Sequence, residues 1–187
     1  WRSLTRNIPW DVDGFALSPD GRTLAVATNE GGFSALRLID TRTGVARKPP
    51  GIPAGIIAAL RYARRSGLLV LQVASATRTG DLYGYLPATG RLTRWTQSEL
   101  GGLDARALVE PTVVQFGTFD GAMIPALYYR PPGAGKFPVL ISIHGGPEGQ
   151  ARPNFAPLTQ FLVGKRQVAV LAPNVRGSTG YGKTYST

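Results

Sequence analysis

The chain has 187 residues and a net charge of +10, with 43% hydrophobic and 17% charged residues, an ordinary composition for one globular domain or parts of two. No apolar run approaches the roughly 18 residues that a membrane-spanning helix requires, so we expect no membrane partner. Cysteine is absent, which excludes disulfides and thiolate metal sites and leaves the compartment open between cytoplasmic and periplasmic or secreted.

The positive charge is spread along the chain rather than gathered on one segment. Residues 1–110 carry 14 Lys and Arg against 9 Asp and Glu, and residues 111–187 carry 7 against 2. The one dense cluster, three arginines between positions 61 and 65, has a single aromatic neighbour. A nucleic-acid-binding surface concentrates both kinds of residue. We therefore expect a solvated basic surface and no nucleic-acid partner.

The first part of the chain contains a degenerate repeat of short predicted strands. Thr23–Ala27 and Ala35–Ile39 are separated by a glycine turn, and the same order recurs as Leu68–Val73 and Asp81–Leu86, with 46 residues between the copies. Short strands with turn signals at this period are typical of β-propeller blades, with a plain β-meander as the alternative. Residues 54–65 fit helical as well as strand spacing.

The repeat is too short for a complete propeller. A closed propeller needs at least about four blades, whereas roughly two are visible in residues 1–106. Edge strands would be left open on both sides, which favours aggregation. The chain also begins at Trp1 rather than at an initiator Met. We therefore predict that residues 1–106 are the last two blades of a propeller and that the chain is a fragment whose natural N-terminus is missing.

From residue 107 the pattern predicts a different kind of sheet. The expected elements are a hairpin of two strands, a strand buried on both faces, an amphipathic helix and a further buried strand: Thr112–Phe116, Met123–Tyr129, Phe137–Ile143, Asn154–Lys165 and Gln167–Ala172. This order is that of the beginning of an α/β-hydrolase sheet. The predicted fold class is therefore mixed, with all-β propeller blades followed by the N-terminal part of an α/β-hydrolase domain over 107–187.

The predicted strand at 137–143 ends in the sequence His144-Gly145-Gly146-Pro147. In α/β-hydrolases such a turn supplies part of the oxyanion hole, because a glycine N–H points at the oxygen that becomes negative. Glycine is required since the backbone turns sharply and approaches the substrate without a Cβ. His144 is the only histidine, and in this fold the catalytic histidine follows the nucleophile, so we expect His144 to support the loop that it begins.

The last predicted strand is followed by a glycine-rich segment, Asn174-Val175-Arg176-Gly177-Ser178-Thr179-Gly180-Tyr181-Gly182. Its glycines permit a tight loop, which Arg176 can fix by a charge-assisted bond to a carboxylate. Ser178 is not a nucleophile elbow, because G-x-S-x-G requires glycine where Arg176 stands, and no other serine fits. Residues 177–184 also match the phosphate-binding pattern G-x-x-x-x-G-K-[ST], which leaves nucleotide binding open as an alternative.

The two motifs, in this order and about thirty residues apart, resemble the prolyl oligopeptidase family of serine peptidases, particularly its acylaminoacyl-peptidase and dipeptidyl-peptidase branches. The resemblance covers nearly the whole chain and is most specific from Phe137 to Tyr185. It implies hydrolysis of peptide or acyl-aminoacyl bonds in short peptides by a Ser-Asp-His triad, with no metal and no cofactor. The triad is expected downstream of Thr187, and the chain alone is expected to be inactive.

The resemblance also assigns roles within the motifs. The oxyanion hole is expected to use the N–H of Gly146, with Gly145 shaping the turn and Pro147 fixing its exit. Support of the two loops is expected from six residues: His144, Pro147, Asn174, Arg176, Gly177 and Tyr181.

Two further alternatives remain at the level of sequence. The chain could belong to a propeller-type binding module without catalytic activity, or to an esterase, because an oxyanion hole does not choose between ester and amide bonds. The partner expected for the peptidase is a short peptide or acyl-peptide substrate. Homo-oligomerisation of the complete enzyme is left open.

Overall fold

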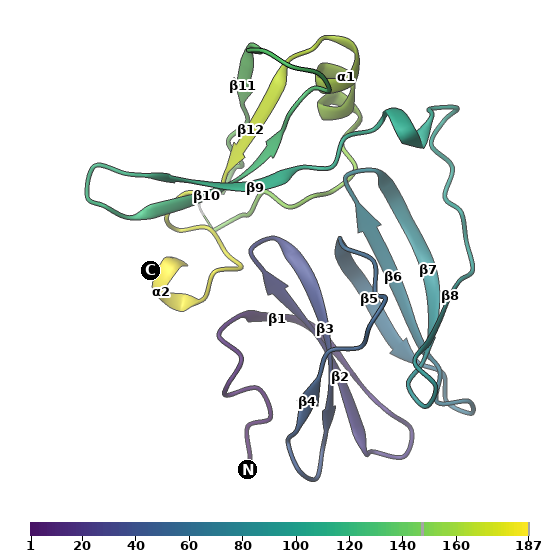
Figure 1. Cartoon of the computed structure of the whole chain (residues 1–187). Coiled ribbons are helices and arrows are strands. Elements are labelled where there is room, and N and C mark those ends of the chain that lie inside the picture. The colour runs from purple at the N-terminus through teal and green to yellow at the C-terminus, as the bar shows by residue number, and fades with distance from the viewer. Residues whose placement is uncertain (147, 187) are drawn as a thin grey trace.

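The computed structural model of the chain describes residues 1–146 and 148–186. This part of the chain is mostly β-structure, arranged as three four-stranded sheets with few helices (Figure 1). It contains no helix whose length and hydropathy would allow it to span a membrane.

The first two sheets repeat one design. Each is a four-stranded antiparallel sheet whose strands follow one another in chain order, and we call them the first blade and the second blade. Their strands are β1 (Asp11–Leu17), β2 (Thr23–Glu30), β3 (Phe33–Asp40), β4 (Ala46–Arg47), β5 (Ile56–Tyr62), β6 (Leu69–Ser75), β7 (Arg78–Leu86) and β8 (Arg91–Arg94). The strands that the repeat predicted are confirmed, and the ambiguous residues 54–65 contain a strand rather than a helix.

The blades share one apolar core. Along β6, side chains alternate between buried and more exposed positions, and Leu69, Leu71 and Val73 are at most 2% exposed. They pack with residues of both sheets: Ala25, Ala27, Leu36, Leu38, Ile57, Leu60, Tyr83 and Tyr85. Burying a side chain of this size contributes about 1.5–3 kcal/mol. The alternation of the sequence therefore directs one face of each blade toward the other.

A buried carboxylate closes the second blade. Asp81 on β7 is 1% exposed and accepts hydrogen bonds from Arg94 Nη2 at 2.6 Å and from the backbone N–H of Ser98 at 2.8 Å. Thr96 Oγ1 donates to the same carboxylate at 3.1 Å. Burial opposes the ionisation of Asp81, but these hydrogen bonds outweigh it and lower the pKa of the carboxyl below its ordinary value. The carboxylate thus ties β7 to β8 and to the chain that leaves the blade.

The third sheet has a different topology. Its order is β11-β12-β10-β9, with β11 and β12 parallel and the other pairs antiparallel. Its strands and the helices that accompany it are η1 (Ala105–Ala107), β9 (Thr112–Gly117), β10 (Met123–Tyr129), β11 (Val139–Ile141), α1 (Pro157–Lys165), β12 (Ala169–Pro173) and α2 (Lys183–Ser186). The hairpin and the later parallel strand confirm the elements expected after residue 107.

The expected burial of the strand at 137–143 was wrong. Strand β11 is shorter than expected, and Val139, Leu140 and Ile141 are 53%, 45% and 60% exposed. The physical reason is position, because β11 is an edge strand whose one partner among the described strands is β12, and α1 packs on β12.

The amphipathic helix expected at Asn154–Lys165 is confirmed only in part, because Leu162 packs against the buried cluster around Val163 while two other apolar side chains are exposed. The helix begins at Pro157 rather than residue 154, in keeping with the preference of proline for the first helical turn. Leu158 and Phe161 are 69% and 51% exposed, whereas Gln160 and Val163 face inward. The Gln160 amide is satisfied there: Nε2 donates to Ala76 O at 2.9 Å, and the carboxamide oxygen accepts from Val109 N at 2.8 Å. These hydrogen bonds of Gln160 hold this face of α1 against the end of β6 and the segment before β9.

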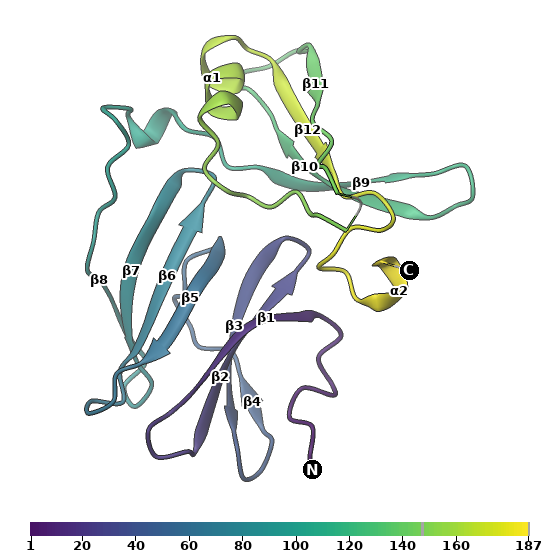
Figure 2. The ribbon, with the colours of Figure 1, turned by 180° about the vertical axis from the view of Figure 1, so that it is seen from behind.

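The third sheet lies against the end of both blades (Figure 2). Ala76, at the end of β6, belongs to one apolar cluster with Leu127, Tyr129, Val163 and Val170 of the third sheet and its helix. Phe33, the first residue of β3, packs against the same cluster. The sheets are therefore joined by a buried contact, which places the loops at the end of the third sheet beside the first blade.

Candidate functional site

The two sequence motifs lie side by side at the carboxyl ends of the parallel strands β11 and β12. The His144-Gly145-Gly146 segment follows β11, and Asn174 to Gly182 follows β12. Ligand sites of open α/β sheets lie at this edge, because loops from neighbouring parallel strands converge there. We call the segments 144–146 and 174–182 the HGG turn and the glycine loop.

The HGG turn presents its backbone to solvent. Gly146 has φ 56°, a left-handed conformation that favours glycine, and no atom would lie within 4 Å of a Cβ at Gly145 or Gly146. Among the described residues, neither glycine N–H donates to a protein acceptor. Two successive donors are therefore open to a ligand at the end of a parallel strand.

His144 joins the turn to the glycine loop. Its Nε2 lies 2.9 Å from Ser178 Oγ, and its Nδ1 lies 3.4 Å from Gly145 O. Ser178 is fully buried, and its N–H donates to Val175 O at 3.0 Å. The pair has the separation of a serine–histidine dyad, but a serine without accessible surface cannot be reached by a substrate.

Asn174 fixes the start of the glycine loop. It is fully buried, and its carboxamide brackets Ala151, accepting from Ala151 N at 2.6 Å and donating to Ala151 O at 3.0 Å. Its Nδ2 also donates to Tyr181 Oη at 2.9 Å. Tyr185 Oη donates to the Asn174 carbonyl at 2.6 Å. This one side chain therefore holds the segment after the HGG turn against the glycine loop.

Arg176 anchors the loop to the hairpin of β9 and β10. Its guanidinium pairs with Asp120 in the turn of that hairpin and lies 5.9 Å from the centre of the Phe119 ring. Hydrogen bonds from Thr118 and Arg176 lower the pKa of Asp120 to about 2. The charge-assisted bond that the sequence suggested for Arg176 is thus made to one of the two carboxylates that follow position 110.

The aromatic residues of the loop are packed rather than free. The rings of Tyr181 and Tyr185 lie 4.9 Å apart, and burial raises the pKa of both hydroxyls. Gly177 has φ 93°, and its N–H donates to Tyr185 O at 2.9 Å. Of the expected support residues, Pro147 lies outside the described residues.

The amides of the glycine loop are already occupied, which argues against a phosphate site at 177–184. The N–H groups of residues 177, 178, 179 and 180 donate to Tyr185 O, Val175 O, Gly149 O and the Asp11 carboxylate. A phosphate-binding loop instead leaves successive N–H groups free for the anion.

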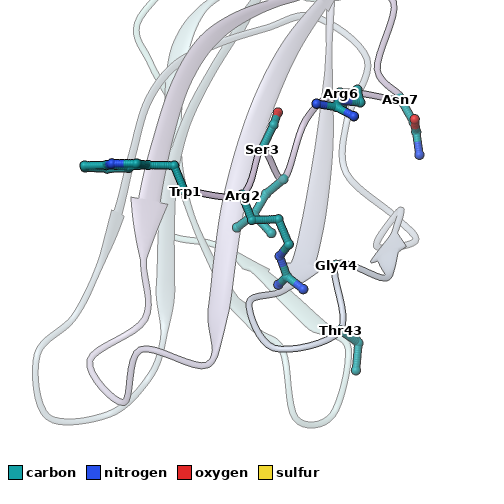
Figure 3. Close-up of a pocket in the computed structure, with 8 residues that line it drawn as sticks. Trp1, Arg2, Ser3, Arg6, Asn7, Thr43 and Gly44 are labelled. Carbon is teal, nitrogen blue, oxygen red and sulfur yellow. The ribbon is translucent and has the colours of Figure 1, made fainter.

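Other features of the described chain lie apart from this edge. A cavity of about 340 Å³ is lined by the N-terminal segment and the turn at Thr43 and Gly44, with the Arg2 and Arg6 side chains at its rim and Trp1 pointing away (Figure 3). The described residues hold no group of three or more His, Cys, Asp or Glu side chains that could ligate a metal.

Comparison with curated proteins gives two peptidases. The chain is 35% identical over 78 residues to the uncharacterised peptidase YuxL of Bacillus subtilis, a match to 40% of this chain and 12% of that protein. It is 24% identical over 181 residues to dipeptidyl-peptidase 5 of Aspergillus fumigatus, which is 93% of this chain and 25% of that protein. No model of a known protein family matches the chain.

Solved structures of peptidases share the fold. The acylaminoacyl peptidase of Pyrococcus horikoshii superposes with a TM-score of 0.76 at 22% identity over 99% of this chain, and a puromycin-hydrolysing peptidase of Mycobacterium tuberculosis with 0.76 at 23% over 92%. The chain resembles the peptidases of the prolyl oligopeptidase family. It spans 28% and 26% of the two solved chains, so it corresponds to about a quarter of such a peptidase.

In this peptidase-like chain, sequence reasoning missed the residues that join the site to the first blade. Asp11 and Asn29 of that blade contact Gly180 and Gln150 beside the site. Ser178, set aside as a nucleophile, is the partner of His144. The missing signal was long-range proximity, because Asp11 and Asn29 lie in strands that have no motif of their own.

Proposed function

We propose that the chain is part of a serine peptidase that hydrolyses peptide or acyl-aminoacyl bonds in short peptides. In this proposal residues 1–106 are the last two blades of a β-propeller, and residues 107–187 are the first part of an α/β-hydrolase domain. The parallel pair β11 and β12 with α1 between them supports the second assignment, because a parallel strand–helix–strand crossover is the unit on which such domains are built.

The observation that carries the proposal is the open pair of glycine N–H groups at the end of β11. Attack on a peptide carbonyl turns its oxygen into an oxyanion, and a fixed donor at that place stabilises the transition state by about 3 kcal/mol. We assign this role to the N–H of Gly146, with Gly145 beside it. The positive φ of Gly146 and the open space around it support the assignment, since a substrate can approach this backbone without meeting a side chain.

The remaining catalytic groups are assigned to residues outside these 187. No serine of the chain has the G-x-S-x-G pattern. Ser178 is buried, and His144 is engaged by Ser178. A serine nucleophile, its histidine base and an orienting aspartate would have to reach the solvent side of the HGG turn. The chain then contributes stabilisation of the oxyanion and the frame that positions it.

The experiment compares two glycines of the HGG turn in the complete protein. Gly146→Ala places a Cβ at φ 56°, which strains the turn, whereas Gly145 has no positive φ and open space around it. For Gly146→Ala we expect kcat toward dipeptidyl and acyl-aminoacyl p-nitroanilides to fall about tenfold or more, since one oxyanion donor is worth about 10²–10³ in kcat. Gly145→Ala is expected to stay within about threefold, in line with the small effect of a substitution that meets no atom.

Two controls separate the alternatives. Complete protein that hydrolyses neither amide substrate while turning over p-nitrophenyl esters would be an esterase. Complete protein that hydrolyses neither class, and is not labelled by a fluorophosphonate, would refute the proposal and leave a binding module. The 187-residue chain by itself is expected to show no turnover above a mock purification.

A further inference from the structure

The segment that follows the HGG turn is bound to the first blade by a forked arginine. Arg152 Nη1 lies 2.8 Å from Asp13 Oδ2 on β1, and the side chains are 19% and 26% exposed. Its Nε donates to Gly32 O at 3.0 Å and its Nη2 to Ser34 Oγ at 3.2 Å. One guanidinium therefore connects the start of the first blade with the turn between β2 and β3 and with β3.

A second contact lies next to the first. Asn29 Nδ2 donates to Gln150 Oε1 at 2.7 Å, while Asn29 Oδ1 accepts from Gly32 N at 2.9 Å. Gly180 of the glycine loop lies on this pair, and a Cβ there would be 2.4 Å from Gln150 Nε2 and 2.6 Å from Asn29 Nδ2. Its N–H donates to Asp11 Oδ2 at 2.9 Å. The blade thus contacts the glycine loop and the segment that follows the HGG turn.

The same segment is tied closely to the open glycines. Gly149 N donates to Gly146 O at 2.6 Å, and Gly149 O accepts from Thr179 N at 3.1 Å. A Cβ at Gly149 would be 2.6 Å from Gly145 O and 3.0 Å from His144 Nδ1. Only two residues therefore separate the anchored Arg152 from Gly149, which contacts the turn directly. Because so few backbone bonds lie between them, a displacement of Arg152 is expected to move Gly149 and, through it, the HGG turn.

We propose that the first blade positions the HGG turn, with Asp13, Asn29 and Arg152 as positioning residues that act through Gln150 and Gly149 on Gly146. The inference rests on the proposed function and extends it. The blade contributes to the chemical step without touching substrate, because it fixes the direction of the Gly146 N–H. A misplacement of about 1 Å in such a group lowers turnover by as much as about 10².

The test uses Asp13→Asn and Arg152→Met in the complete protein, with two measurements. The first is the split between kcat and KM on an acyl-aminoacyl p-nitroanilide. We expect kcat to fall about tenfold with KM within about threefold, because an interaction needed only in the transition state is lost. Asp13→Glu, which keeps the charge, is expected to recover most of kcat. Arg152→Lys, which keeps the charge but loses the fork, is expected to recover little.

The second measurement is amide hydrogen exchange of the peptide spanning 144–153, which does not require activity. Exchange is expected to rise about tenfold in both variants and to stay unchanged in β6, since local opening involves only the contacts that were lost. The matched control is Asp104→Asn, which breaks the exposed Asp104–Arg106 pair far from the turn and should alter neither measurement.

The outcomes distinguish this inference from the proposed function. An active wild type whose Arg152→Met variant keeps kcat within about twofold would overturn the positioning role while leaving the peptidase intact. If the wild type hydrolyses nothing, the proposed function fails, and amide hydrogen exchange alone then tests whether the blade positions the turn. Faster exchange at 144–153 then supports the coupling between blade and turn, and unchanged exchange refutes it.

Discussion

The blades and the third sheet use the same kinds of residue in opposite ways. In the blades, aliphatic side chains on alternate positions are buried between two sheets, and Leu69 and Leu71 have no exposed surface. In the third sheet, the equally aliphatic Val139, Leu140 and Ile141 are about half exposed. Each blade strand finds its partner a turn away, whereas β11 pairs with a strand that follows it by about thirty residues. Composition therefore indicates a strand, and topology decides whether it is buried.

The comparison also separates scaffold from site. The buried Asp81 of the second blade is satisfied by residues that follow it closely in sequence. Polar groups at the end of the third sheet are either open, as at Gly146, or satisfied by distant parts of the chain, as at Arg152. Four predictions sharpen this difference, and the first three compare a change in one region with a matched change elsewhere.

The largest effect is expected from a leucine pair. Leu71→Ala in the blade core should lower the free energy of unfolding by about 2–5 kcal/mol, because it leaves a cavity between two sheets. Leu140→Ala on β11 should lower it by less than about 1 kcal/mol, since the side chain is 45% exposed. Urea denaturation of the 187-residue chain measures both, and equal effects would show that β11 is buried in solution.

The next effect concerns the buried carboxylate of the second blade. Asp81→Ala removes the acceptor of Arg94 and Ser98, and we expect it to lower the free energy of unfolding by about 2–3 kcal/mol. This is less than the value for a fully buried pair, because the Arg94 side chain is 40% exposed. Asp104→Ala, at an exposed pair, serves as the control and should leave the midpoint unchanged. A thermal melt that shifts equally for both would contradict a closing role for Asp81.

A smaller effect is expected where the glycine loop meets the first blade. Gly180→Ala places a methyl group 2.4–2.6 Å from the side chains of Gln150 and Asn29 at φ 87°. We expect it to destabilise the chain by about 1–3 kcal/mol through overpacking added to backbone strain. Gly133→Ala, at φ 104° with no neighbour within 4 Å, carries the strain without the clash. The difference between the urea denaturation midpoints of the two variants measures the effect of the contact with the blade alone.

The smallest effect is a dependence of stability on pH at the hairpin turn. The pKa of Asp120 is lowered from 3.8 to about 2 by Thr118 and Arg176. The folded state therefore gains stability above pH 3.8 and loses it as pH falls toward 2, because protonation breaks these bonds. Asp120→Asn should make the free energy of unfolding, measured by urea denaturation, depend less on pH between pH 5 and pH 2. An unchanged slope would mean that the pair does not form in solution.

Much of the fold could be predicted from local patterns. The repeat predicted four of the eight blade strands, β2, β3, β6 and β7, and the two strand-like runs Thr112–Phe116 and Met123–Tyr129 predicted the hairpin, because these features depend on neighbours in the sequence. The place of the two glycines near the end of a strand could be predicted for the same reason, since HGG follows the strand expected at 137–143. The inward position of Gln160 could not be predicted, because it depends on the Ala76 and Val109 backbone. The contact of Arg152 with Asp13 spans 139 residues and has no local signature.

That distance has a consequence for how the molecule assembles. Contacts between segments so far apart form late, because a long loop must close before they are made. Synthesis runs from the N-terminus, so the first blade with Asp11 and Asp13 leaves the ribosome before Gln150, Arg152 and Gly180 exist. The first blade can then fold before the later loops are synthesised, and these loops pack against it. The geometry around Gly146 thereby depends on the part of this chain that is synthesised first. Misfolding of the first blade would therefore also misplace the loops around Gly146.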